Sequence, residues 1–316
     1  MHMADALLSP TVGIGFYGVS AAALGWSTRQ LGRSVEPRLV PTMGVLGAFV
    51  FAAQMLNFAI PGTGSSGHLA GGLLLAAVLG PAPAFLCMTS VLLVQCLLFG
   101  DGGLLALGCN VFNLGFHPCF VGYPLYRLVA GKTPTPSRRS LALGAGALVS
   151  VELGAVSVAL ETVASGRTPI GLGTFAALMA GIHLPIGLGE AVVTAAAVAL
   201  LWRLRPEQAR PQPDAPRQAW RRMVTAVGLA AALGSGVLAW FASARPDGLE
   251  WSLARAGASP GAGDEVASAR AWPQVSGRTS AEGLGGAAVV LLLSAAVTLP
   301  ALLWRRRRSA VARPIP

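Results

Sequence analysis

Residues 69–99 read LAGGLLLAAVLGPAPAFLCMTSVLLVQCLLF, an apolar stretch that is interrupted once, by Gly80-Pro81-Ala82-Pro83. The part before the interruption, residues 69–80, is short for a helix that crosses a bilayer, which takes about 20 residues. The stretch is therefore either one bent membrane span or two short spans. This choice sets the topology of the chain, because it decides on which side of the membrane every later loop lies.

The composition indicates an all-α, polytopic membrane protein. Of the 316 residues, 53% are hydrophobic and only 11% are charged, whereas about a quarter are charged in soluble domains. The 40 glycines suit helices that pack closely in lipid, where small residues let backbones approach. The net charge of +10 would also suit nucleic acid, but the basic residues fall in short clusters between apolar spans. They indicate topology instead, and no nucleic-acid partner is expected.

The basic clusters decide between one span and two, because Lys and Arg concentrate in cytoplasmic loops. Treating 69–80 and 84–99 as separate spans puts nearly all basic residues on one side, whereas merging them separates the first two clusters. We therefore expect seven spans with the N-terminus outside, at residues 11–27, 41–60, 69–80, 84–99, 104–126, 141–163 and 172–202. The cytoplasmic clusters are then Arg29, Arg33 and Arg38; Arg127, Lys132, Arg138 and Arg139; and Arg203, Arg205, Arg210, Arg217, Arg221 and Arg222.

A second unit is predicted after these seven spans. A polar segment that bears proline and arginine follows them, as is typical of a domain boundary. The run from Arg305 to Arg308 predicts a cytoplasmic C-terminus. The predicted units are a membrane domain at 1–205, a cytoplasmic linker at 206–222 and a two-span accessory domain at 223–316, with spans at 223–243 and 284–304 around an outer loop at 244–283.

The first two residues, Met1 and His2, carry three nitrogens in succession, namely the α-amine, the backbone amide and the imidazole. A metal ion there closes a five-membered and a six-membered chelate ring. His68, in the small-residue loop Ser65-Ser66-Gly67-His68, supplies a fourth nitrogen. Square-planar nitrogen sites suit Ni(II) and Cu(II), whereas zinc prefers a tetrahedron. The alternative is a chance histidine after the first methionine. No cleavable signal peptide is expected, so Met1 should remain the first residue.

Several longer motifs resemble those of the CbiM/NikM family, the substrate-binding membrane subunits of energy-coupling-factor (ECF) transporters for cobalt and nickel. The segment Pro246-Asp247-Gly248-Leu249-Glu250 further resembles the signature of the two-span accessory subunit CbiN/NikN, fused here to the same chain. The resemblance covers roughly residues 1–205. The motifs that carry it are Met1-His2-Met3-Ala4-Asp5, Ala52-Ala53-Gln54-Met55-Leu56-Asn57-Phe58, Pro61-Gly62, Ser66-Gly67-His68, Phe99-Gly100-Asp101-Gly102-Gly103, Asn110-Val111-Phe112-Asn113 and His183-Leu184-Pro185-Ile186-Gly187 with Glu190.

The resemblance implies a metal site made by the Met1 amine, the His2 amide and imidazole nitrogens, and the His68 imidazole. It also implies partners in the plasma or inner membrane, a transmembrane coupling (T) subunit and cytoplasmic ATPase (A) subunits. The chain itself has no G-x-x-x-x-G-K-[ST] phosphate loop. We therefore expect a multi-pass transporter subunit rather than an enzyme, with no permanent cofactor and with Ni(II) or Co(II) as the transported ion.

Several polar residues of the apolar spans leave alternatives open. Asp5 is predicted either to bond a metal-bound imidazole or to cap the first helix. His117 is a core histidine or a transit ligand. The amide side chains are expected to hydrogen-bond across the bundle, and the cysteines to be buried as small apolar groups. The amides are Gln54, Asn57, Asn110 and Asn113, and the cysteines are Cys87, Cys96, Cys109 and Cys119.

His183 and Glu190 lie seven residues apart and so share a helix face. A structural hydrogen bond within the bundle is the first interpretation and a role in coupling is the second. An intramembrane metalloenzyme built on this pair is an alternative function, although no H-E-x-x-H pair is present. A scaffold subunit that binds no metal is another.

Overall fold

The chain is largely helical in the computed structural model, which describes residues 2–34, 38–204, 217–237, 241–257 and 284–293. The long helices are α1 (Pro10–Ser34), α2 (Leu39–Gln54), α4 (Pro81–Phe99), α7 (Pro136–Ala164), α8 (Leu172–Leu204) and α10 (Arg217–Gly236). The short ones are a 3₁₀ turn η1 (Asp5–Leu7), α3 (Gly72–Leu79), α5 (Leu107–Val111), α6 (Tyr123–Ala130), α11 (Gly248–Arg255) and a helix at Leu284–Leu293. A π-helix η2 (Phe112–Gly122) joins α5 to α6, and strands β1 (Phe58–Ala59) and β2 (Ser66–Gly67) form a small hairpin.

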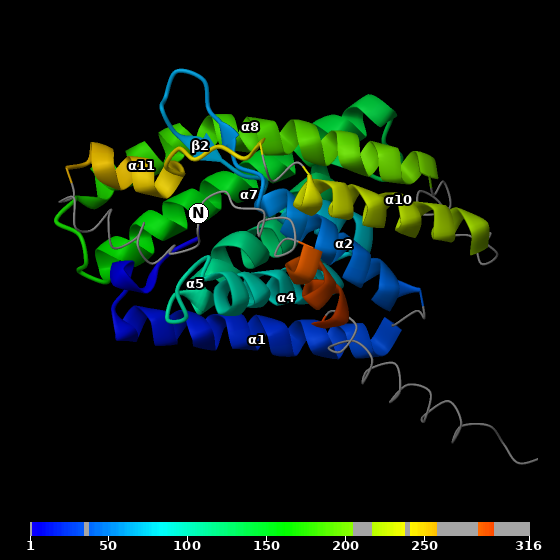
Figure 1. Cartoon of the computed structure of the whole chain (residues 1–316), viewed down its shortest axis with the longest axis horizontal. Coiled ribbons are helices and arrows are strands. Elements are labelled where there is room, and N and C mark those ends of the chain that lie inside the picture. Colours follow the sequence, from blue (N-terminus) through cyan, green and yellow to red (C-terminus); the bar gives the residue numbers. More distant parts are fainter. Residues whose placement is uncertain (1, 35–37, 205–216, 238–240, 258–283, 294–316) are drawn as a thin grey trace, which may run out of the picture.

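The long helices run roughly side by side, with α1 along one side of the bundle and α7 and α8 along the other, while α2, α4 and α5 lie between them (Figure 1). Large apolar side chains fill the interior, among them Phe51, Phe85 and Phe175. The start of α1 and the whole of α11 lie at one end of the bundle. The opposite end holds the end of α1 and the starts of α2 and α10. Three basic residues belong to these helix ends, namely Arg29 of α1, Arg38 directly before α2 and Arg221 of α10.

The interrupted stretch at 69–99 folds as two separate helices, as predicted. Gly80 ends α3 with a φ of +85°, a backbone conformation that favours glycine, and Pro81 takes the first position of α4, where its missing N–H costs nothing. However, α3 has only eight residues and is about 12 Å long, less than half of the roughly 30 Å hydrocarbon core. The β1–β2 hairpin and the His68 loop occupy the preceding residues instead of a longer helix.

Three helices among the described residues are long and apolar enough to cross a membrane, namely Pro81–Phe99, Pro136–Ala164 and Leu172–Arg203. The predicted span 41–60 ends early, at Gln54, and the span at 104–126 consists of α5, η2 and α6. The predicted linker is shorter than expected, because α10 already begins at Arg217. Residues 206–216 of the linker and 294–304 of the last span lie outside the described residues. The count of nine spans therefore stays a prediction.

Candidate metal centre

The N-terminal segment is inserted into the bundle by hydrogen bonds to the backbone of Met3, which is fully buried. The Met3 N–H donates to Asn110 Oδ1 at 2.8 Å, and Asn110 Nδ2 donates back to the Met3 carbonyl at 3.2 Å. The Gly103 N–H donates to the same carbonyl at 2.8 Å. Because both atoms of the Asn110 amide and one loop N–H bond to Met3, the backbone next to His2 has a defined position.

Two glycines of the Phe99-to-Gly103 motif make this insertion possible. A Cβ atom at Gly103 would lie 1.8 Å from Asp5 Oδ1 and 2.4 Å from the Asp5 nitrogen, which no side chain tolerates. Gly102 has a φ of +93°, and a Cβ there would lie 2.7 Å from Asn110 Nδ2. The motif therefore lets the N-terminal segment approach the loop backbone closely.

His2 and His68, which are 66 positions apart in the sequence, lie side by side in the fold. Their imidazole rings stack with centroids 5.1 Å apart and planes inclined by 23°. Both side chains are buried, with exposed fractions of 3% for His2 and 8% for His68. Met1, the remaining residue of the predicted site, lies outside the described residues.

His68 presents one nitrogen that is suited to bind a metal ion. Its Nδ1 lies 3.1 Å from the Leu69 carbonyl, so the proton is assigned to Nδ1 and the lone pair to Nε2. Within the described part of the chain, this Nε2 is buried and has no hydrogen-bond partner. Burial also lowers the pKa of the imidazole to about 3. The ring is therefore neutral at physiological pH, which is the form that ligates metals.

Asp101 is a member of the site that the sequence analysis did not single out. Its Oδ2 lies 3.5 Å from His2 Nδ1, the ring nitrogen through which the six-membered chelate ring would close. The signal was available, because Asp101 stands within the quoted Phe99-to-Gly103 motif. Asp5 has neither of its two expected partners, since its Oδ1 accepts the Ala106 N–H at 3.0 Å. Ser9 caps α1 in its place, accepting the Val12 N–H at 3.4 Å.

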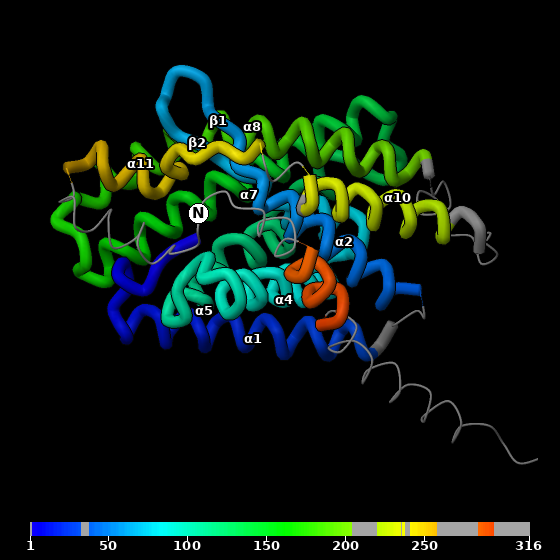
Figure 2. The backbone as a smooth tube through the Cα atoms, in the orientation of Figure 1, coloured from blue at the N-terminus to red at the C-terminus, as the bar shows by residue number. Residues whose placement is uncertain are grey.

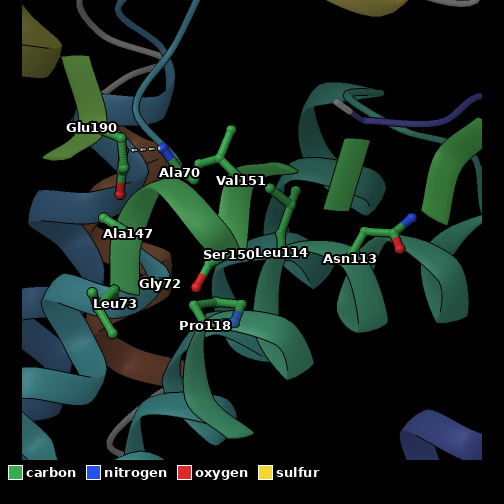
Figure 3. A pocket seen from close by; sticks show the side chains of 10 residues that line it. All are labelled: Ala70, Gly72, Leu73, Asn113, Leu114, Pro118, Ala147, Ser150, Val151 and Glu190. Atoms are coloured by element: carbon green, nitrogen blue, oxygen red, sulfur yellow. Dashed lines mark hydrogen bonds between the residues drawn. The ribbon is translucent and has the colours of Figure 1, made fainter. Parts of the chain in front are cut away.

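The backbone that follows His68 is braced from two helices. Glu190 of α8 accepts the N–H of Ala70 through Oε2 and that of Gly71 through Oε1, both at 2.8 Å. From α2, Gln54 Nε2 donates to the Ala70 carbonyl at 2.7 Å, as expected for a cross-bundle amide. Figure 3 shows the hydrogen bond from the Ala70 nitrogen to Glu190 as a dashed line. The brace fixes the loop two residues beyond the His68 ring.

His183 and Glu190 lie on one face of α8 but do not form a hydrogen bond with each other. His183 Nδ1 lies 2.7 Å from the Met179 carbonyl on its own helix, whereas Glu190 holds the loop backbone. Each side chain has a structural hydrogen bond, as first interpreted. No group of three His, Cys, Asp or Glu side chains gathers within the described ranges. This argues against the alternative of a catalytic zinc centre there.

The segment Pro246–Glu250 packs onto the loop that carries His68. The Ser66 N–H donates to the Pro246 carbonyl at 2.8 Å, and Ser66 Oγ donates to the Arg245 carbonyl at 2.7 Å. Asp247 and Glu250 form a capping box that starts α11. Figure 2 shows the strand-like chain before α11 running beside the β1–β2 hairpin. The last unit of the chain therefore contacts the loop that carries His68.

The sequence profile of the CbiM family, described as the cobalt uptake substrate-specific transmembrane region, matches residues 2–208. The chain belongs to the CbiM family. A second profile, that of the PDGLE domain, matches residues 221–277. The predicted resemblance to a CbiM/NikM subunit fused to a NikN-like unit is thereby confirmed.

Relatives with this fused organisation are nickel transport proteins by name. The chain is 37% identical over 207 residues to a putative fused nickel transport protein of Archaeoglobus fulgidus, covering 66% of this chain and 67% of the relative. It is 31% identical over 199 residues to a cobalt transport protein of Chlorobium limicola, covering 61% and 78% of the two chains. Among solved structures, a truncated transition metal transporter is similar with a TM-score of 0.57 and 33% identity, covering 64% of this chain and 99% of that one.

These relationships establish the chain as a multi-pass membrane component of metal uptake. They confirm the prediction of a transport protein rather than an enzyme. CbiM family proteins are transporter components that work with partner subunits, and the ions that the named relatives carry are nickel and cobalt.

Proposed function

We propose that this protein captures Ni(II) or Co(II) on the outer side of the membrane as the substrate-binding subunit of an ECF-type transporter. The ligands are the Met1 amine, the His2 amide and imidazole nitrogens, and His68 Nε2. The observation that carries the proposal is the buried His2–His68 pair, with a neutral His68 whose Nε2 has no hydrogen-bond partner among the described residues.

The separation of the two rings suits a shared ion. With metal–nitrogen bonds of about 2.0 Å, two imidazoles on one ion have centroids roughly 4.5 to 6.5 Å apart, from adjacent to opposite positions. The observed 5.1 Å lies within that range. The other two nitrogens of the proposed set come from the main chain, namely the Met1 amine and the His2 amide. Such a nitrogen set favours planar Ni(II) and low-spin Co(II).

The proposed topology places the N-terminus, the His68 loop and residues 244–283 outside, with seven spans before residue 205 and two after it. Residues 223–316 are the accessory unit, which contacts the His68 loop through Ser66 and Pro246. Because the chain has no phosphate loop of its own, a coupling (T) subunit and ATPase (A) subunits of an ECF transporter supply the energy. The basic end of the bundle faces those ATPases in the cytoplasm.

Metal binding by His68→Ala tests the proposal. The purified full chain is dialysed to equilibrium against Ni(II) and against Co(II). Loss of one of four nitrogens should cost about 3 kcal/mol, or roughly 100-fold in affinity. His183→Ala is the matched control, since it removes a second buried imidazole outside the proposed ligand set. Equal affinity of His68→Ala and wild type would refute the proposal.

A further inference from the structure

Two polar pairs stack between η2 and α7 on the inner side of the N-terminal segment. Asn113 Nδ2 donates to Glu161 Oε2 at 2.8 Å, and His117 Nε2 lies 2.9 Å from Ser157 Oγ. On each helix the two members are four residues apart, so the pairs lie on successive turns. Asn113 Nδ2 also lies 3.8 Å from Met3 Sδ. The pairs are therefore two steps that lead inward from the segment carrying the proposed outer site.

The outer of these pairs has more acceptors than donors. Glu161 and Asn113 are 2% and 1% exposed. Within the described part of the chain, Glu161 Oε1 and Asn113 Oδ1 are buried without a hydrogen-bond partner of ordinary geometry. The Cys109 thiol lies beside the carboxyl, but a thiol is only a weak donor. A buried, uncompensated carboxyl is costly in a membrane bundle. A divalent cation bound here would compensate both oxygens.

The helix that carries Asn113 and His117 is itself unusual. η2 keeps π-helical geometry over 11 residues with Pro118 inside it, whereas π-helices are mostly single turns and frequently mark functional sites. A cavity of about 10 Å³ adjoins Asn113, lined by Leu114, Pro118 and Ser150 among others (Figure 3). This is about the room that one water molecule needs. The cavity adjoins the helix that carries Asn113, while the Asn113 side chain points away from it (Figure 3).

We propose that Asn113 and Glu161 form an inner binding site that takes the divalent cation after it leaves the outer site. The inference rests on the proposed capture of Ni(II) or Co(II) at the N-terminal segment. The carboxylate oxygen of Glu161 and the amide oxygen of Asn113 are the ligands, and water completes the shell. Oxygen ligands hold these ions less tightly than a nitrogen chelate does. The inner site is thus suited to receive an ion and to release it.

Cobalt titration of the purified full chain tests the inner site separately from the outer one. Bound Co(II) per chain is measured by equilibrium dialysis up to millimolar Co(II), together with the visible absorption of the bound ion. The variant Glu161→Gln keeps the shape and an acceptor for Asn113 Nδ2 but removes the charge. Glu152→Gln, on the same helix but away from the N-terminal segment, is the matched control. Asn113→Leu is a second variant in case Glu161→Gln fails to fold.

The wild type and Glu152→Gln should bind one more Co(II) per chain than Glu161→Gln or Asn113→Leu, with the weak absorption bands of an oxygen-ligated ion. The tighter, nitrogen-ligated ion should keep its affinity in Glu161→Gln within about 3-fold. In His68→Ala the pattern should reverse, with the inner ion retained and the outer one lost. Equal Co(II) per chain in Glu161→Gln and wild type would mean that Glu161 is a protonated structural group, and it would overturn the inner site. Retention of both ions in His68→Ala would instead count against the proposed outer site alone.

Discussion

The Glu190 carboxylate on α8 accepts the backbone N–H of Ala70 at 2.8 Å, two residues beyond His68. The Ala70 carbonyl accepts a hydrogen bond from Gln54 Nε2 of α2 at 2.7 Å. Both backbone groups of Ala70 are thus held by side chains from different helices. Ala70 follows His68 by only two residues. The brace on Ala70 therefore sets the direction in which His68 Nε2 points.

Glu190→Gln should therefore weaken Ni(II) binding without removing a ligand. The glutamine NH₂ group cannot accept an N–H, so either Ala70 or Gly71 loses its partner. Changing a group that orients a ligand typically costs about 10-fold to 100-fold in metal affinity. Equilibrium dialysis checks the loss. Thr194→Val is the control, because it removes the Thr194 Oγ1 hydrogen bond to Glu190 Oε1 at 3.4 Å but keeps both carboxylate oxygens that accept the loop N–H groups. Unchanged affinity in Glu190→Gln would show that the brace does not position His68.

Gly103→Ala should expel the N-terminal segment from the bundle. The added methyl group would lie 1.8 Å from Asp5 Oδ1, so the segment or the loop has to move. We expect Ni(II) affinity to fall at least about 10-fold, while the helical circular dichroism stays at the wild-type level. Gly15→Ala on α1 serves for comparison, since nothing lies within 4 Å of a Cβ there. A Gly103→Ala chain that binds Ni(II) normally would contradict the close approach of segment and loop.

The buried imidazole of His68 predicts a pH dependence of stability in the metal-free chain. Its pKa falls from 6.5 to about 3 on folding because burial disfavours the charged ring. Below pH 6.5 the unfolded chain binds a proton that the folded chain does not, so stability falls as the pH decreases toward 3. The slope is at most about 1.4 kcal/mol per pH unit.

Thermal unfolding in detergent between pH 7 and pH 4 measures this slope. His68→Gln, which has no titratable ring, should lose less stability over the same interval than the wild type. If both proteins lose stability in parallel, then protonation of His68 contributes nothing to the acid sensitivity.

Gly248→Val should detach α11 from the His68 loop. A Cβ atom at position 248 would lie 2.7 Å from His183 Cε1, and a valine adds two further methyl groups. The hydrogen bonds of Ser66 to Pro246 and Arg245 should then be lost. Metal uptake by cells that contain the whole transporter is the measurement, and a reduction of several-fold is expected. Gly285→Val is the control, with open space at its Cβ. Normal uptake by Gly248→Val would mean that this docking is dispensable.

The helical break at Gly80-Pro81 could be predicted from the sequence, because both residues act locally. The short α3 and the π-helix could not be predicted in this way. The residues before Gly72 are apolar enough for a longer helix, but Gln54 and Glu190 bond the backbone of Ala70 and Gly71 and hold it in a loop. Those partners come from α2 and α8, which are distant in the sequence, so periodicity carries no trace of them.

The meeting of His2 and His68 was predicted from chelate chemistry and from a family resemblance, and the two rings do stack. Asp101 was quoted only as part of the Phe99-to-Gly103 motif, and its carboxylate lies 3.5 Å from His2 Nδ1, a proximity between distant segments that the sequence does not show. His183 and Glu190 share a helix face and each has a structural hydrogen bond within the bundle, but with different partners. The helical period predicts which residues share a face. It does not predict that the Glu190 carboxylate accepts the N–H groups of Ala70 and Gly71.

The most direct test of the account is the Ni(II) affinity of a chain whose amino terminus is blocked. Two forms are compared in which the same short peptide is added either before Met1 or after Pro316. The N-terminal addition replaces the α-amine with an amide and leaves His2 and His68 unchanged. The account predicts that it lowers Ni(II) affinity at least about 100-fold and abolishes the yellow absorption of a planar nitrogen-ligated ion, whereas the C-terminal addition changes neither. Equal affinity and equal absorption in the two forms would contradict a site built on the Met1 amine.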